Sequence, residues 1–189
     1  RNLLSRILLS MGDAPGALAH AEAGIALAAD PALRSRLGPL RMRQARALCD
    51  RFEVHLIADE IAVGFGRTGT LFAHQQAGIR PDFICLSKGL TGGTLPLSAV
   101  LTTDAVYAAF YDHDVTRGFL HSHSYTGNPL ACRAAIATLE LFDQTDVLAD
   151  NARTAQQLDL AFAPLTHHPA IRNARRIGML WAWDVDPEY

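Results

Sequence analysis

The pattern of hydrophobic and polar positions changes character once along the chain, near Gly38 and Pro39. Before that point, residues 3–37 are dominated by Ala and Leu, and apolar residues recur at three- and four-residue spacing. The stretches "GDAP" and "ADP" interrupt this periodicity. The spacing therefore predicts two helices that form a hairpin over residues 1–37.

After residue 38, short apolar runs alternate with longer helical patterns. The runs predict buried strands, which we place at residues 53–59, 81–88, 97–103 and 179–185. The helical patterns predict helices at residues 40–52, 103–112, 128–144 and 148–165, the third of them buried. Strands that alternate with helices predict an α/β fold whose sheet is mostly parallel and flanked by helices.

The composition is that of a globular protein and narrows the choice of partners. Of the 189 residues, 49% are hydrophobic and 19% are charged, and the formal net charge is −2. This charge gives no electrostatic reason to expect nucleic acid or an anionic membrane as a partner. No apolar run approaches the length of a membrane span, and no signal peptide is recognisable. We expect small-molecule substrates and a cytoplasmic protein.

The three cysteines, Cys49, Cys85 and Cys132, are widely spaced and form no CxxC pattern. Buried free thiols in a reducing compartment explain them better than a disulfide or a metal site does. His121 and His123 could share one face of an extended segment, but no third ligand with suitable spacing follows them. The sequence therefore predicts no metal site.

Two residues at predicted strand ends carry the candidate chemistry. Asp59 closes the first strand, and Lys88, the single lysine of the chain, closes the second in "CLSKGLTGGT". Ligands of α/β sheets bind where strands end. Pyridoxal phosphate chemistry requires a lysine that forms a Schiff base with the aldehyde and an acid that faces the pyridine nitrogen. From spacing alone, a structural pair or no pairing at all is an open alternative.

A long segment decides between these interpretations by resemblance. "LIADEIAVGFGRTGTLFAHQQAGIRPDFICLSKGLTGGTLPLSAVLTT" closely resembles the fold-type I, class III pyridoxal-phosphate aminotransferases. "TLPLSAVLTT" and "FLHSHSYTGNPLAC" look more like the branch of that family that acts in biotin synthesis than like its ornithine or 4-aminobutyrate branches. The resemblance runs from about residue 40 to the last residue.

The resemblance implies a role for each matching residue. Asp59 would pair with the pyridinium nitrogen, Ile61 would lie near the ring, and Lys88 would bond to the cofactor and move the proton. Arg67 and Ser122 would lie near the substrate. Ser124 would donate to the cofactor phosphate, together with a main-chain amide near His123. Glu60 would either brace the turn or contact Arg67.

The resemblance also implies a reaction and an assembly. An amino group would pass from S-adenosylmethionine to 8-amino-7-oxononanoate and give 7,8-diaminononanoate, with pyridoxal 5'-phosphate as the cofactor. The segment around Ser124 would reach into the site of a neighbouring subunit, so the active unit would be a homodimer. Another class III omega-aminotransferase is the nearest alternative.

Several expected parts of such an enzyme do not match. The phosphate-binding turn and the ring-stacking aromatic residue should precede residue 40, where the Ala/Leu pattern stands instead. We therefore expect residues 1–37 to be a repeat-like hairpin foreign to the family, residues 38–174 a partial large domain, and residues 175–189 the start of a truncated small domain. Apolar faces should then be uncovered. A non-catalytic fragment, whose hairpin binds another protein, is the alternative of a different class.

Overall fold

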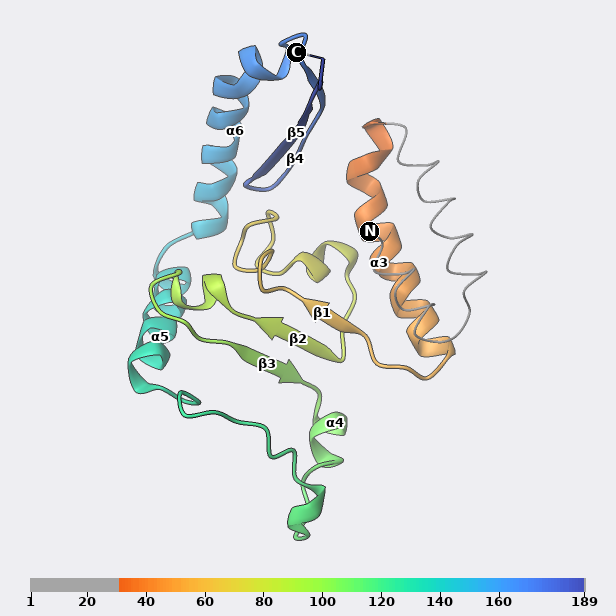
Figure 1. Ribbon diagram of the computed structural model, residues 1–189, viewed down its shortest axis with the longest axis vertical. Coiled ribbons are helices and arrows are strands. Elements are labelled where there is room, and N and C mark those ends of the chain that lie inside the picture. The colour runs from red at the N-terminus through yellow and green to blue at the C-terminus, as the bar shows by residue number, and fades with distance from the viewer. Residues whose placement is uncertain (1–30, 189) are drawn as a thin grey trace. The chain divides into compact units, whose positions relative to one another are not determined.

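The computed structural model describes residues 31–188 (Figure 1). Within this part, the chain forms two compact units. One contains residues 31–56 and 74–80, and the other contains residues 57–73 and 81–188. The predicted hairpin over residues 1–37 lies outside the described residues except for its last seven positions.

The first unit is built on helix α3, Pro31–Arg51. The helix predicted for residues 40–52 is confirmed, but it begins earlier and continues through Pro39. Ala45 and Cys49 of α3 are buried and pack together with Leu56. On the same unit, the Arg43 guanidinium donates to the carbonyl oxygen of Ala77 at 2.8 Å, at the end of the 3-10 helix η1, Ala73–Ala77. The buried cluster of Ala45, Cys49 and Leu56 lies entirely within the first unit.

The second unit contains a three-stranded sheet made of β1 (Ile57–Asp59), β2 (Phe83–Leu86) and β3 (Ala99–Thr102). The strand order is β1-β2-β3, with β1 parallel and β3 antiparallel to β2. The three strands predicted for this region are confirmed, although each is shorter than the predicted run. The α/β class is confirmed as well.

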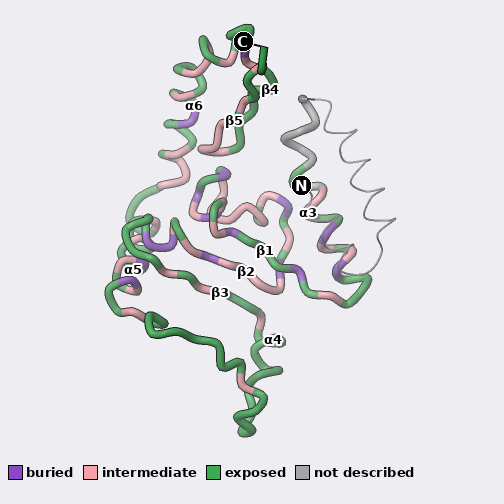
Figure 2. Tube along the Cα trace, in the orientation of Figure 1, coloured by how far each residue is buried: buried purple, intermediate pink, exposed green. Residues whose placement is uncertain are grey.

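Burial in this sheet is lighter than the sequence predicts. Leu86, Leu90 and Ala135 form the buried cluster, with half-buried aromatic and aliphatic residues around it. The prediction that the first strand is buried is wrong for Ile57, which is 52% exposed because β1 is an edge of the described sheet. Val100 of β3 is also exposed, as expected for an uncovered apolar face (Figure 2).

Helices follow the sheet in the predicted order. These are α4 (Asp104–Ala108), α5 (Pro129–Gln144) and α6 (Val147–Thr166), with a short 3-10 helix η3 (Val115–Arg117) after α4. The Thr103 hydroxyl caps α4 by accepting from the Val106 amide, as predicted. The prediction that α5 is buried is wrong for most of its surface. Only its Ala131 and Ala135 are buried, whereas Leu130, Ile136, Leu139 and Leu141 are exposed.

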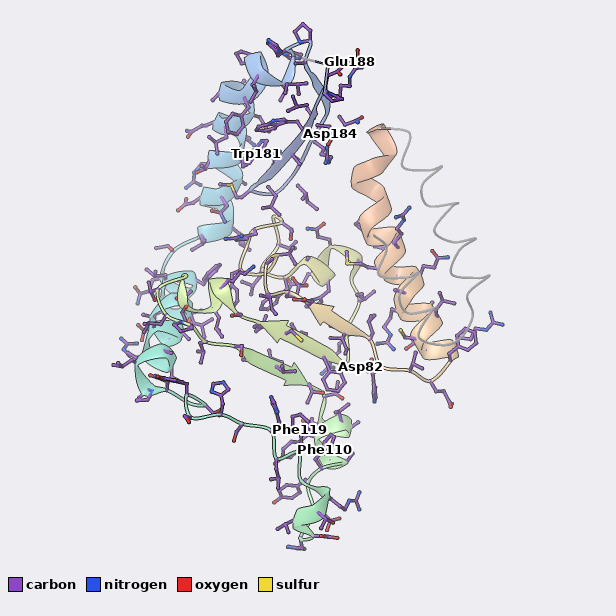
Figure 3. All side chains as sticks on the ribbon, in the orientation of Figure 1. Asp82, Phe110, Phe119, Trp181, Asp184 and Glu188 are labelled. Carbon is purple, nitrogen blue, oxygen red and sulfur yellow. The ribbon has the colours of Figure 1, made fainter. Side chains whose placement is uncertain are left out.

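The chain ends in a hairpin of β4 (Ile171–Ile177) and β5 (Leu180–Val185). The strand predicted for residues 179–185 is confirmed, whereas β4 was not predicted because "RNARR" is too charged to resemble a buried strand. The hairpin packs on α6. Phe162 lies between Trp181 and Trp183, with ring centroids 5.6 and 6.0 Å away, and the Trp181 indole donates to Asp159 at 2.9 Å (Figure 3).

Two further findings bear on the sequence predictions. Cys49, Cys85 and Cys132 are free thiols, and Cys49 alone of the three is fully buried. Among the helices of residues 31–188, none has both the length and the apolar character that a membrane crossing requires.

Candidate active site

The backbones of Asp59 and Lys88 lie at the same edge of the sheet. Asp59 is the last residue of β1 and stands opposite Cys85 of the parallel strand β2. The amide of Glu60 donates to the Cys85 carbonyl at 3.0 Å, which continues the pairing by one residue. Lys88 follows two residues after β2 ends and begins the 3-10 helix η2, Lys88–Thr91. Both side chains are exposed at these carboxyl ends of parallel strands, where α/β folds bind their ligands.

Lys88 holds an unusual backbone conformation. Its φ is +43°, in the left-handed region that costs a non-glycine residue about 1–2 kcal/mol. The neighbours fix this geometry. The Ser87 hydroxyl donates to the Leu97 carbonyl at 2.7 Å, and a Cβ at Gly89 would lie 2.8 Å from the ring of Phe65. Backbone strain that the surroundings maintain is concentrated at functional sites.

The carboxylates of Asp59 and Glu60 have different surroundings. Asp59 is exposed, and its Oδ1 accepts from the Ile61 amide at 3.1 Å, which orients the carboxylate. Glu60 is only 2% exposed, and its Oε2 accepts from the Ala73 amide at 2.9 Å. The sequence left two roles open for Glu60, and this hydrogen bond corresponds to the first of them, bracing the turn.

Arg67 lies in the loop that follows, which doubles back on itself. The amide of Gly66 donates to the Leu71 carbonyl at 3.2 Å, and the amide of Gly69 donates to the Gly66 carbonyl at 3.1 Å. The Arg67 side chain is exposed, whereas Ile61, at the start of the loop, is half-buried. This geometry leaves the guanidinium able to reach an anionic ligand.

The segment before α5 forms one wall of a hollow. Its volume is about 660 Å³, and Ser122 and His123 line it, together with Ser87, residues 95–98 and residues 125–128. Asp59, Lys88, Ile61, Arg67 and Ser124 do not line it. The structure thus brings the predicted residues together as two groups, Asp59 with Lys88 at the sheet edge and Ser122 with His123 at the hollow. Ser87, next to Lys88, lies on the hollow's wall.

Hydrogen bonds around Ser124 decide which donors a phosphate could use. Asn128 Oδ1 accepts from the Leu130 amide at 2.9 Å and from the Ala131 amide at 3.4 Å, so α5 already has its cap. The His123 amide donates to the Thr126 hydroxyl oxygen at 3.0 Å. Ser124 is exposed and has no hydrogen-bond partner among the described residues. Its hydroxyl and amide are therefore among the donors that this turn leaves for a ligand.

The sequence analysis assigned no role to Ser87, Thr126 or Asn128, although all three line the hollow. Asn128 could have been found, because Asn directly before Pro at a helix start is a capping signal. Ser87 carries no such local signal, since its hydroxyl donates to the carbonyl of Leu97 in another part of the chain. As for metals, no group of three or more His, Cys, Asp or Glu side chains suited to an ion occurs within residues 31–188.

Comparison with known proteins identifies the class of protein. The family "Aminotransferase class-III" matches residues 38–189, which is most of the chain. The chain belongs to this family.

Individual relatives narrow the similarity. The chain is 46% identical over 149 residues to the adenosylmethionine-8-amino-7-oxononanoate aminotransferase of Helicobacter pylori. This alignment covers 76% of the chain and 34% of the relative. A crystal structure of the Methanocaldococcus jannaschii enzyme with the same name superposes on this chain with a TM-score of 0.66 and 37% sequence identity. The match covers 72% of this chain and 32% of the M. jannaschii chain. A Bacillus anthracis aminotransferase gives a TM-score of 0.72 at 30% identity, with coverages of 77% and 32%. The chain thus spans about a third of the length of these relatives.

Proposed function

We propose that this chain is part of a pyridoxal-phosphate-dependent aminotransferase that converts 8-amino-7-oxononanoate to 7,8-diaminononanoate, with S-adenosylmethionine as the amino donor. The observation that carries the proposal is the position of Asp59 and Lys88 at the carboxyl ends of two adjacent parallel strands, with Lys88 held in a strained conformation. The substrate assignment rests on the 46% identity to the H. pylori relative.

The residues at the sheet edge fit pyridoxal phosphate. Once bound, this cofactor withdraws electrons from the carbon that bears the amino group and so acidifies its proton. Asp59 supplies a carboxylate, already oriented by the Ile61 amide, to the ring nitrogen. Lys88 would hold the cofactor through its amine, and its Nζ, when the substrate has displaced it from the cofactor, would hold and move the proton. Ile61 offers an apolar side chain to the ring.

The remaining site residues bind charged groups. Ser124 donates its hydroxyl to the phosphate, aided by a main-chain amide of the turn at His123, where the Ser124 amide has no other partner in the described part of the chain. Arg67, whose side chain is exposed, lines the substrate pocket. Ser122, on the wall of the hollow, lies near the substrate.

The same proposal includes a homodimer in the cytoplasm. Ser122 and His123 belong to a different group from Asp59 and Lys88 within one chain, and a neighbouring subunit can bring the two groups together. The exposed rings of Phe110 and Phe119, whose centroids are 5.8 Å apart, favour a covered surface on this segment (Figure 3). Three free thiols suit a reducing compartment.

The test is cofactor loading. Purified protein is titrated with pyridoxal phosphate, scanned in the visible, reduced with borohydride and digested for mass spectrometry. We expect an absorption band and a modified peptide that contains Lys88, and we expect both to be lost in Lys88→Ala. Asp59→Asn should keep the covalent bond and weaken retention of the cofactor. If no band forms, the chain is the non-catalytic alternative.

A second candidate is another class III aminotransferase with a different substrate. It is favoured by the TM-score of the B. anthracis aminotransferase, 0.72, which exceeds the 0.66 of the M. jannaschii enzyme. Half-reactions of the loaded protein with S-adenosylmethionine and with ornithine separate the two, because loss of the absorption band reports which donor reacts. Reaction with ornithine alone would overturn the substrate assignment.

A further inference from the structure

The turn between β4 and β5 touches the loop that carries Arg67. The amide of Met179 donates to the carbonyl oxygen of Arg67 at 2.8 Å. Gly178, with φ at +55°, approaches the same stretch of backbone. A Cβ at Gly178 would lie 2.3 Å from the carbonyl carbon of Thr68, 2.4 Å from the amide nitrogen of Gly69 and 2.5 Å from the carbonyl oxygen of Arg67. All three are backbone atoms, so no side-chain rotation could make room.

The loop is also supported by α6. A Cβ at Gly66, whose φ is +85°, would lie 3.0 Å from both Asn151 Nδ2 and Leu148 Cδ2. The hairpin and α6 are in turn joined to each other. Asp159 of α6 accepts from the Trp181 indole at 2.9 Å and pairs with the Arg176 guanidinium at 3.0 Å. Helix and hairpin therefore form one support, against which the backbone of residues 66–69 rests.

The base of the loop is fixed separately. Glu60 accepts from the Ala73 amide with its side chain, and its carbonyl accepts from the Gly64 amide at 2.9 Å. These bonds hold the ends of the loop but not its tip. At Arg67 itself, the Met179 amide is the backbone partner of the carbonyl. The position of the guanidinium therefore depends on the β4–β5 turn.

We propose that Gly178 and the Met179 amide are positioning residues that fix the backbone of Arg67 in the substrate pocket. This rests on the proposed function of Arg67. Gly178 acts by its lack of a side chain, which permits the close approach, and Met179 acts by its N–H. Neither residue touches the substrate.

The first experiment measures the contact without ligand. Amide hydrogen exchange is followed in the unchanged full chain, in Gly178→Ala and in Gly78→Ala. Gly78 is the matched control, because its φ of +61° imposes the same backbone strain on alanine and no atom lies within 4 Å of its Cβ position. We expect a protected Met179 amide in the unchanged chain. Gly178→Ala should raise exchange in residues 61–72 at least tenfold, and Gly78→Ala should not.

Local proteolysis gives an independent readout. Release of the loop should speed tryptic cleavage after Arg67 at least fivefold relative to cleavage after Arg133, which is exposed on α5. Equal exchange and equal cleavage in a folded Gly178→Ala protein would overturn the proposal. If Gly178→Ala does not fold, the Met179 amide decides. If the Met179 amide of the unchanged chain exchanges as fast as in an unstructured peptide, its hydrogen bond to Arg67 does not exist and the proposal fails.

The second experiment links the contact to the substrate. Affinity for 8-amino-7-oxononanoate is measured in Arg67→Ala, in Gly178→Ala and in the double variant. We expect each single variant to lose about tenfold in affinity and the double variant to lose no more than Arg67→Ala alone. Additive losses would refute action through Arg67. If Arg67→Ala alone has no effect, the proposed role of Arg67 fails, while the exchange data still decide whether the turn holds the loop.

Discussion

Lys88 combines a reactive amine with a backbone conformation that favours glycine. The left-handed φ of +43° is set by the packing of Phe65 against Gly89 and by the bond from Ser87 to Leu97. An L-amino acid other than glycine loses free energy there, and the chain nevertheless has its single lysine at this position. This cost in stability is what the proposed role of Lys88 would explain.

Lys88→Gly should stabilise the protein in the absence of cofactor. Removal of the Cβ relieves the left-handed strain, while glycine adds entropy to the unfolded chain, so we expect a gain of up to about 1 kcal/mol in the free energy of unfolding. Lys88→Ala keeps the strain and is the control, for which no gain is expected. Urea denaturation measures both. A loss of stability in Lys88→Gly would show that the lysine side chain itself stabilises the fold.

Glu60→Ala should destabilise the second unit. The change leaves the half-buried Ala73 amide without its carboxylate partner, which costs about 1–3 kcal/mol. Glu140→Ala is the matched control, because Glu140 forms an exposed ion pair with Arg133 at 3.1 Å, worth at most about 1 kcal/mol. Thermal and urea unfolding compare the two. Equal effects would mean that the Glu60 brace contributes nothing special to stability.

At the scale of elements, ion pairs join the two ends of the hairpin β4–β5 across its strands. Arg172 pairs with Asp186, and Arg175 pairs with Asp184 at 3.3 Å. The hydrogen bond from the Arg172 guanidinium, followed by that from the Glu188 amide, holds the pKa of Asp186 below its ordinary value of 3.8. The charged form of this carboxylate is thus the one that binds its partners.

The lowered pKa of Asp186 makes the end of the hairpin sensitive to acid. Its contribution is complete above the ordinary aspartate pKa and is lost as the pH falls through the lower pKa of the folded state. We expect the Asp186 carboxyl resonance to titrate below 3.8. Arg172→Met should move this pKa up toward the ordinary value. Arg133→Met, on α5, should leave it unchanged, and an unchanged Asp186 in Arg172→Met would contradict the assigned cause.

How far the sequence predicts this structure depends on the range of the forces involved. The three sheet strands, α4 with its cap, α5 and α6 all follow from local periodicity and capping. The strand β4 does not, because its charged residues are stabilised by pairs across the hairpin rather than by burial. Likewise, Ser87 is held at the hollow by its bond to the Leu97 carbonyl, which no local pattern encodes.

At the scale of the whole molecule, apolar side chains remain exposed over much of the second unit. Between α4 and α5 the exposed residues include four large apolar ones, Tyr111, Phe119, Leu120 and Tyr125, each more than 70% exposed. Contiguous exposed apolar surface of this kind marks an interaction site. It is the surface on which the proposed dimer would rest.

Dimer formation should therefore depend on this segment. Phe110→Ser combined with Phe119→Ser should shift the sedimentation equilibrium toward monomer at least tenfold, with unchanged far-ultraviolet circular dichroism. Leu160→Ser is the control, because Leu160 is 79% exposed on α6, outside this segment. If the double variant associates as strongly as the parent, the dimer of the proposal uses another surface.

The contact between Gly178 and residues 67–69 also restricts how such proteins can be recombined. It joins backbone to backbone across segments that are far apart in the sequence, so neither side can compensate by a new side chain. A crossover between residues 69 and 178 would place a loop from one parent against a turn from another. Chimeras in which either parent has an insertion in the loop or in the turn should not fold, whereas chimeras that take loop and turn from the same parent should fold. In a gene-shuffling library, the functional members should have residues 67–69 and Gly178 from the same parent.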